Sequence, residues 1–323
     1  MTQHNIPDPS TQDIPQAMNL FKSVLFPVLI IIGFQLSNMI AIRIETLIPA
    51  DKTVVMWSVL KWSVIGLIAL VNAILITGMG ILAHDGVHKV LFRNRVVNDL
   101  LSSVLSAHAL LPFYANRQFH LRHHSFAHQP GIDPEEVIHN RPYLAALLVG
   151  PFFGLLAQYN ILLANILDLL NIKKCFRAMA DMMAICFAGF SYFYWLPLMG
   201  IELNYTVIPL LIVLPLVYNY RAMSDHYGLP AVIRKSEKEK STKLENNHTL
   251  QEETSGWVVE TTPLLEWLWS NINYHEVHHK YPYLSYNHLP EMFEKTRDKF
   301  PYAVVNGYTR SLINLRKQSY YKK

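Results

Sequence analysis

Cysteine is scarce in this sequence, with only Cys175 and Cys186 among 323 residues. The two form no spaced pattern, which excludes a disulfide framework and a cysteine metal site. Charged residues are also few, at 16% of the chain, whereas 51% of the residues are hydrophobic and gather in long runs. This balance predicts a membrane protein. The net charge of +4 comes from dispersed basic residues beside apolar runs, a pattern that favours membrane topology and no nucleic-acid partner.

Other common signatures are missing as well. The sequence has no glycine-rich phosphate loop, no G-x-S-x-G elbow and no internal repeat. Residues 1–20 form a polar N-terminal tail without the basic and apolar pattern of a cleaved signal peptide, so the first apolar run is expected to stay as an anchor.

Five apolar runs are close to the ~20 residues that a helix needs to cross a bilayer. They cover residues 24–42, 62–83, 143–167, 182–201 and 203–220. Basic residues cluster at 89–95, after the second run, and at 173–177, before the fourth run. Because cytoplasmic loops are enriched in lysine and arginine, these ends are predicted to be cytoplasmic, with both termini on the same side.

The run at 143–167 is interrupted by Gly150-Pro151, which would kink a helix. Two histidine-rich stretches lie before and after three of the runs, and both can face the cytoplasm only if one run does not cross. We therefore predict that 143–167 is an interfacial helix and that four helices span the membrane. The whole chain, 1–323, is expected to be one all-α integral membrane domain with a cytoplasmic histidine-rich cap and a mobile cytoplasmic loop at 234–255.

Nine of the fifteen histidines fall in four short stretches at the predicted cytoplasmic ends. The stretches are "HDGVH" (His84, His88), "HLRHH" (His120, His123, His124), "SDHYG" (His226) and "HEVHH" (His275, His278, His279). Spacings of three and four residues place helical side chains on one face, so each multi-histidine stretch can direct its imidazoles toward one point. The other histidines (His4, His108, His128, His139, His248 and His288) are expected to be mostly ordinary polar or capping residues.

The pattern H-x-x-H-H is expected roughly 0.03 times by chance but occurs twice. The second occurrence also contains H-E-x-x-H, the signature of a zinc protease with Glu276 as its general base. A zinc hydrolase needs about three protein ligands, whereas eight or nine convergent histidines suit two metals. We therefore expect Glu276 to be a surface or supporting residue that points away from the ligands. Imidazole binds several transition metals, so spacing alone leaves the element open.

With these residues the sequence resembles the membrane fatty acid desaturase superfamily, which includes hydroxylases and carotenoid ketolases. All eight box histidines match its three histidine boxes, and the similarity extends over about residues 60–295. The resemblance implies a cytoplasmic non-haem centre of two iron ions that uses O2 and two electrons on an unactivated C–H bond. It also implies that His226 is a further ligand. Some members carry an asparagine four residues earlier, but this chain has Ala222 there, so that role is not transferred.

Asp85 and Asp133 are candidates to orient imidazole N–H groups, although a helix-end position or a capping role would explain them equally well. No H-P-G-G haem motif is present, so we expect electrons from a separate ferredoxin or cytochrome b5 type protein and its reductase.

The predicted reaction is O2-dependent desaturation of a fatty acyl chain. Hydroxylation or ketolation of a lipid or carotenoid by the same centre remains open, as does terminal-alkene or alkyne formation. A zinc protease and a non-catalytic metal-binding membrane protein are the alternatives from other classes.

Overall fold

The computed structural model describes residues 13–47, 54–230, 255–300, 302–316 and 321–322. Most of the expected tail, residues 1–12, and nearly all of the loop expected at 234–255 lie outside the described part of the chain. Helices dominate it, with short strands only in the C-terminal third. The all-helical prediction is confirmed at this level.

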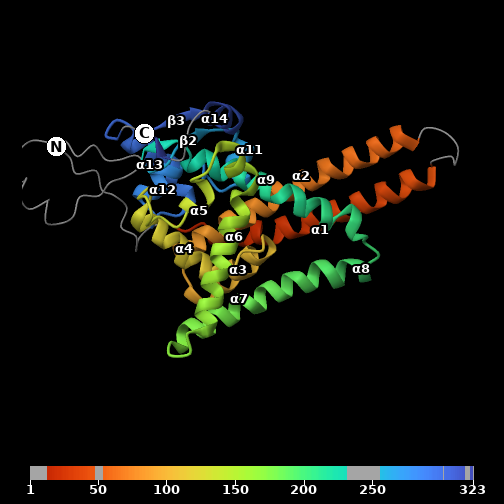
Figure 1. The fold of residues 1–323 in the computed structure, drawn as a ribbon, viewed down its shortest axis with the longest axis horizontal. Helices are drawn as coiled ribbons and strands as arrows, with labels where there is room; N and C mark the ends of the chain where they lie inside the picture. Colours follow the sequence, from red (N-terminus) through yellow and green to blue (C-terminus); the bar gives the residue numbers. More distant parts are fainter. Residues whose placement is uncertain (1–12, 48–53, 231–254, 301, 317–320, 323) are drawn as a thin grey trace, which may run out of the picture.

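The long helices are α1 (Gln16–Leu47), α2 (Val54–Val87), α6 (Tyr143–Leu167), α7 (Ile172–Phe190) and α9 (Val207–His226). Helix α7 continues through a π-helical turn, Ser191–Trp195, into α8 (Leu196–Leu198), and a 3-10 turn, Leu203–Tyr205, leads into α9. Figure 1 shows α1 and α2 side by side, with the C-terminal end of α1, the N-terminal end of α2 and α8 at the end of the molecule remote from the strands.

Within the described residues, five helices are long and apolar enough to cross a membrane. Helix α6 is one of them, yet Figure 1 shows it running across the direction of α1 and α2. Helices α3 (Arg95–His108) and α4 (Phe113–Phe126) form a further apolar pair that is bent by 95°. The count of four spanning helices therefore stays a prediction.

The remaining elements form the cap. They are α5 (Glu136–His139), β1 (Leu229–Pro230), β2 (Val258–Glu260), α11 (Pro263–Leu268), α12 (His275–Lys280), a 3-10 turn (Tyr286–His288), α13 (Leu289–Thr296), β3 (Val304–Asn306), α14 (Tyr308–Leu315) and β4 (Tyr321–Lys322). Strand β1 pairs in parallel with β4, and β2 pairs in parallel with β3. These pairs join the segment after α9 to the C-terminal segment.

A buried lysine fastens the cap to the first membrane helix. Lys22 of α1 is 1% exposed, and its Nζ donates to the carbonyl of Trp267 at 2.5 Å and to Ser270 Oγ at 3.1 Å. The ammonium also lies 4.7 Å from the centre of the Tyr286 ring. Because a buried ammonium is costly unless it is paired or hydrogen-bonded, these contacts fix the chain just before α12 against α1.

Helix α6 carries Pro151, which has no N–H to bond the carbonyl four residues earlier. Asn219 of α9 compensates, because its Nδ2 donates to the carbonyls of Ala146 and Leu147, each at 2.7 Å. The break is thereby converted into a contact between α6 and α9. Both helices also line the cavity described below.

The glycines on either side of Pro151 leave space for Ile138 of α5. A Cβ on Gly150 would lie 2.6 Å from the Ile138 carbonyl, and one on Gly154 would lie 2.6 Å from Ile138 Cδ1. At Gly150 the neighbour is backbone, so only glycine allows so close an approach there, whereas at Gly154 the neighbour is the end of a side chain. The "GPFFG" segment therefore seats α5 and the residues just before it against the membrane helices.

Candidate metal centre

Nine histidines from α2, α4, α9 and α12 meet at one place, although almost two hundred residues separate the first from the last. His84 lies in the last turn of α2 and His88 directly follows that helix, while His120, His123 and His124 lie on two turns of α4. His226 is the last residue of α9, and α12 carries His275, His278 and His279. The structure thus brings together all nine histidines named from the sequence.

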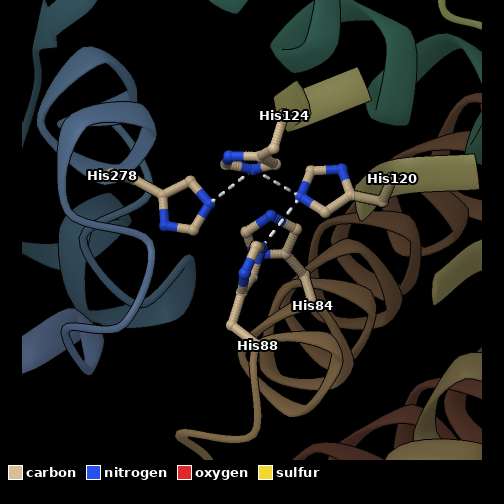
Figure 2. Close-up of side chains that lie close together, drawn as sticks. All are labelled: His84, His88, His120, His124 and His278. Atoms are coloured by element: carbon tan, nitrogen blue, oxygen red, sulfur yellow. Dashed lines mark hydrogen bonds between the residues drawn. The ribbon is translucent and has the colours of Figure 1, made fainter. Parts of the chain in front are cut away.

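Five of these imidazoles form a first group, shown in Figure 2: His84, His88, His120, His124 and His278. One ring nitrogen from each lies within 4.8 Å of the corresponding nitrogens of the others. Their Nε2 atoms are 3.0 Å apart for His88 and His120, 2.8 Å for His120 and His124, and 3.2 Å for His124 and His278. Nitrogens ~2.1 Å from one metal ion would have about this spacing.

A second group lies beside the first and comprises His123, His226 and His279, whose nitrogens also lie within 4.8 Å of one another. His275 adjoins it, with Nε2 at 2.8 Å from His226 Nε2 and 3.1 Å from His279 Nε2. The rings of His124 and His279 stack at 4.2 Å between centroids and connect the two groups. Two neighbouring clusters of nitrogens suit two metal ions better than one.

The two aspartates proposed as supports differ. Asp133 Oδ1 lies 2.8 Å from His123 Nδ1, and its other oxygen accepts from the backbone N–H of His128 at 2.8 Å. Asp133 therefore both caps its turn and orients an imidazole, leaving His123 Nε2 for the centre. Asp85 lies 3.9 Å from His84 Nδ1, too far for a hydrogen bond, and accepts from the backbone N–H of Tyr286 at 3.4 Å.

Other neighbours of the second group carry no sequence motif. Glu135 Oε2 lies 3.7 Å from His226 Nε2 and 3.9 Å from His123 Nδ1, and Asp225 Oδ2 lies 3.8 Å from His275 Nδ1. Asp225 also forms a buried ion pair with Arg221 one turn earlier on α9. The "DPE" turn was the only signal that could have pointed to Glu135.

Two histidines that the sequence placed among the ordinary ones lie next to the second group. His128 Nε2 is 3.2 Å from His226 Nδ1, and His139 Nε2 is 3.8 Å from Glu135 Oε2. Both side chains are buried. In contrast, two histidines lie away from the cluster. His108 Nδ1 is 3.0 Å from Tyr192 Oη, and at the surface His288 Nε2 is 2.9 Å from the Asp13 carbonyl oxygen. His4 and His248 lie outside the described residues.

Glu276 is buried, at 1% exposure, so a surface position for it is wrong. Its Oε2 accepts from the backbone N–H and hydroxyl of Ser255, and its Oε1 lies 3.2 Å from Lys280 Nζ. The Ser255 carbonyl in turn lies 3.0 Å from His226 Nδ1. Glu276 thus acts as a supporting residue, because it holds Ser255, just before β2, in place against His226.

Two of the α12 histidines are held in the neutral form that binds metal, whereas His123 gains basicity from neighbouring carboxylates. Burial, and then neighbouring imidazoles, lower the pKa of His278 and His279 well below its usual value, so both rings are neutral at pH 7. Burial alone would lower the pKa of His123 too, but Glu135 and Asp133 outweigh it and raise that pKa. Neutral imidazole is the form that ligates metals, and a carboxylate on the remaining nitrogen increases its basicity.

The nitrogens fit a resident metal in one further respect. Neither ring nitrogen of His84, nor Nε2 of His123, has a hydrogen-bond partner among the described residues, although all three atoms are buried. Leaving buried polar atoms unpaired costs ~1–3 kcal/mol each, whereas a metal ion would use their lone pairs. The donor set of neutral nitrogens suits iron, copper, nickel or zinc.

A cavity of about 270 Å³ between the long helices reaches the first group. His84 and His120 form part of its wall, together with apolar side chains such as Ile81, Phe119 and Leu214. Helices α2, α4, α6 and α9 contribute most of the lining. The centre is thus accessible to a narrow, largely apolar ligand. Glu276 is not among the lining residues.

The family model for fatty acid desaturases matches residues 60–309, well over half of the chain. The chain belongs to the fatty acid desaturase family. This membership supports an oxidoreductase of the desaturase or hydroxylase type, and the long apolar helices agree with an integral membrane protein. Iron-dependent catalysis is characteristic of the family, and the histidine cluster is able to bind metal. A separate comparison with curated proteins found no match.

Proposed function

We propose that this member of the desaturase family uses a non-haem di-iron centre and O2 to introduce a double bond into a fatty acyl chain. The observation that carries the proposal is the convergence of nine imidazoles in two adjacent groups at the end of an apolar cavity. The nine ligands would be His84, His88, His120, His123, His124, His226, His275, His278 and His279.

Bound iron would supply the oxidising power that an unactivated C–H bond requires. The chain's own residues hold and orient the reactants. Ile81, Phe119 and Leu214 confine an acyl chain beside His84 and His120 and keep bulk water away from the reacting carbon. Asp133 fixes the tautomer of His123, so that its Nε2 rather than Nδ1 faces the centre.

The cytoplasmic side is the proposed location of the centre. The basic residues Lys89, Arg93 and Arg95 follow His88 directly, and such residues are enriched in cytoplasmic segments. Electrons would come from a separate ferredoxin or cytochrome b5 type donor and its reductase, on the same face.

The protease alternative is disfavoured by Glu276. Both of its oxygens are engaged by Ser255 and Lys280, and the residue does not line the cavity, so it is not placed to activate water on a substrate.

The decisive experiment is expression in a host of known lipid content, followed by mass spectrometry of total lipids. A loss of two hydrogens from an acyl chain supports desaturation, whereas added oxygen supports hydroxylation or ketolation and overturns the proposed reaction. His120→Ala, His123→Ala and His278→Ala should each abolish the product while the protein still inserts in the membrane. Substantial product from any of them would contradict a shared centre.

A further inference from the structure

The cavity follows one face of three helices from the histidines into the membrane domain. Thr77, Gly80, Ile81 and His84 of α2 have the spacing that places side chains on a single helix face. Pro151, Gly154, Leu155 and Gln158 of α6 repeat that spacing, as do Leu211, Leu214, Pro215 and Tyr218 of α9. Along α2 the lined face extends from His84 to Thr77, about 10 Å at the rise of an α-helix.

Gly80 keeps this path open between the metal end and Thr77. A Cβ built on Gly80 would have no heavy atom within 4 Å. The α3–α4 loop contributes Ala109, Leu110 and Leu111 to the lining of the cavity. Tyr159, next to Gln158, donates its hydroxyl to the Leu110 carbonyl at 3.1 Å, which places that turn of α6 against the same loop.

Two buried oxygens in this lining lack partners. Thr77 is 1% exposed and Gln158 is 5% exposed, yet neither Thr77 Oγ1 nor Gln158 Oε1 has a hydrogen-bond partner among the described residues. Each unpaired buried polar atom carries an uncompensated desolvation cost. A plain methylene chain in the cavity would leave both costs in place.

We infer that the cavity binds a lipid chain that carries a hydroxyl group, with Thr77 and Gln158 hydrogen-bonding that hydroxyl about 10 Å from the histidines. In the proposed arrangement the hydroxyl would donate to the Gln158 amide oxygen and accept from the Thr77 hydroxyl, so that one group would satisfy both side chains. The inference rests on the proposed function for the identity of the site, and it narrows the substrate to a hydroxylated acyl chain.

The test is equilibrium binding to the iron-loaded protein in detergent, without O2 or reductant. The probes are stearate and a series of hydroxystearates that differ in hydroxyl position, each displacing a fluorescent fatty acid. We expect one or two neighbouring positional isomers to bind about tenfold more tightly than stearate. Equal binding of stearate and every isomer would overturn the inference, since water would then satisfy the two oxygens.

Variants localise the effect. Thr77→Val and Gln158→Leu should each remove the preference for the hydroxylated isomer while stearate binds at least as tightly as before. Ile81→Val is the control, because it trims the same wall without changing polarity and should weaken both ligands alike. A preference that survives in both Thr77→Val and Gln158→Leu would place the hydroxyl elsewhere and overturn the assignment.

The outcome separates this inference from the proposed function. If expressed protein oxidises plain acyl lipids and shows no preference for any isomer, the function stands and the hydroxyl site fails. If the preference is present but neither plain acyl lipids nor the preferred hydroxylated isomer, supplied to the expressing host, is oxidised, the hydroxyl site stands and the proposed reaction fails.

Discussion

The two histidine groups are supported in different ways. In the first group, described residues provide imidazole neighbours and helix packing, and Asp85 is too far from His84 for a hydrogen bond. In the second group, Asp133 bonds His123 directly, and the Ser255 carbonyl contacts His226. The first group also forms part of the cavity wall. The first group therefore borders the cavity and is held by the packing of its helices, whereas the second group is held by hydrogen bonds from neighbouring polar groups.

The helices that carry the first group are held together by polar contacts that do not touch the imidazoles. A Cβ on Gly86, between His84 and His88, would lie 1.7 Å from Ser102 Oγ, so α2 and α3 approach closely there. Arg117 of α4 donates to the Gly86 carbonyl at 2.8 Å and forms a two-point ion pair with Asp99 of α3. The support acts through backbone placement and not through the imidazole rings.

The largest expected effect comes from removing one imidazole from each group. His226→Ala should lower bound iron from two to about one per chain, because only His123, His275 and His279 would remain around the second metal. His88→Ala leaves four imidazoles in the first group and should retain more iron, although product is lost in both variants. Metal analysis of purified protein measures this difference, and full iron occupancy in His226→Ala would contradict the assignment of two groups.

Removing a carboxylate should lower the iron affinity of the second group more than that of the first. Asp133→Asn places an amide where His123 and the His128 N–H both need an acceptor, and loss of such a support typically weakens metal affinity ~10–100-fold. Asp85→Asn is the matched control, because Asp85 makes no hydrogen bond to an imidazole, and it should change iron affinity by less than about threefold. Competition with an iron chelator gives both values. Similar losses in the two variants would show that the supports do not differ.

The imidazoles of both groups were predictable from the sequence, whereas most of the polar neighbours of the second group were not. Spacings of three and four residues place His84 with His88 and His120 with His124 on common helix faces, and local geometry then determines how they project. Glu135, Asp225, His128 and Ser255 approach the second group only because α5, α9 and β2 fold together. The number of spans also escapes local rules, because α6 has the length and apolarity of a spanning helix but crosses the direction of α1 and α2.

A smaller effect is expected where α5 is seated. Gly150→Ala would place a methyl group 2.6 Å from the Ile138 carbonyl, so α5 and Glu135 must move, at a cost of ~1–3 kcal/mol in unfolding free energy. Gly189→Ala is the control, since nothing lies within 4 Å of its Cβ. Replacing a helical glycine there should be neutral or stabilise by up to ~1 kcal/mol. Denaturant unfolding in detergent compares the two variants. Equal unfolding free energies would mean that α5 can shift away from α6 at no cost.

The smallest effect should come from the remote support of the first group, and it should depend on pH. Burial opposes ionisation of Asp99, but hydrogen bonds and charge from Arg117 outweigh it and lower the pKa of the carboxyl. Asp99 is partly exposed, so solvent screening limits its ion pair to ~1 kcal/mol or less.

A carboxyl whose pKa is lower in the folded state stabilises that state above the unfolded pKa of about 3.9. This stabilisation is lost as pH falls through the lower folded value. Wild type should therefore exceed Asp99→Asn in unfolding free energy by a constant amount from pH 7 to about pH 5, and the gap should close below about pH 4. A gap that is unchanged down to pH 3 would show that Asp99 acts by packing rather than by charge, and the first group would then lack even this remote electrostatic support.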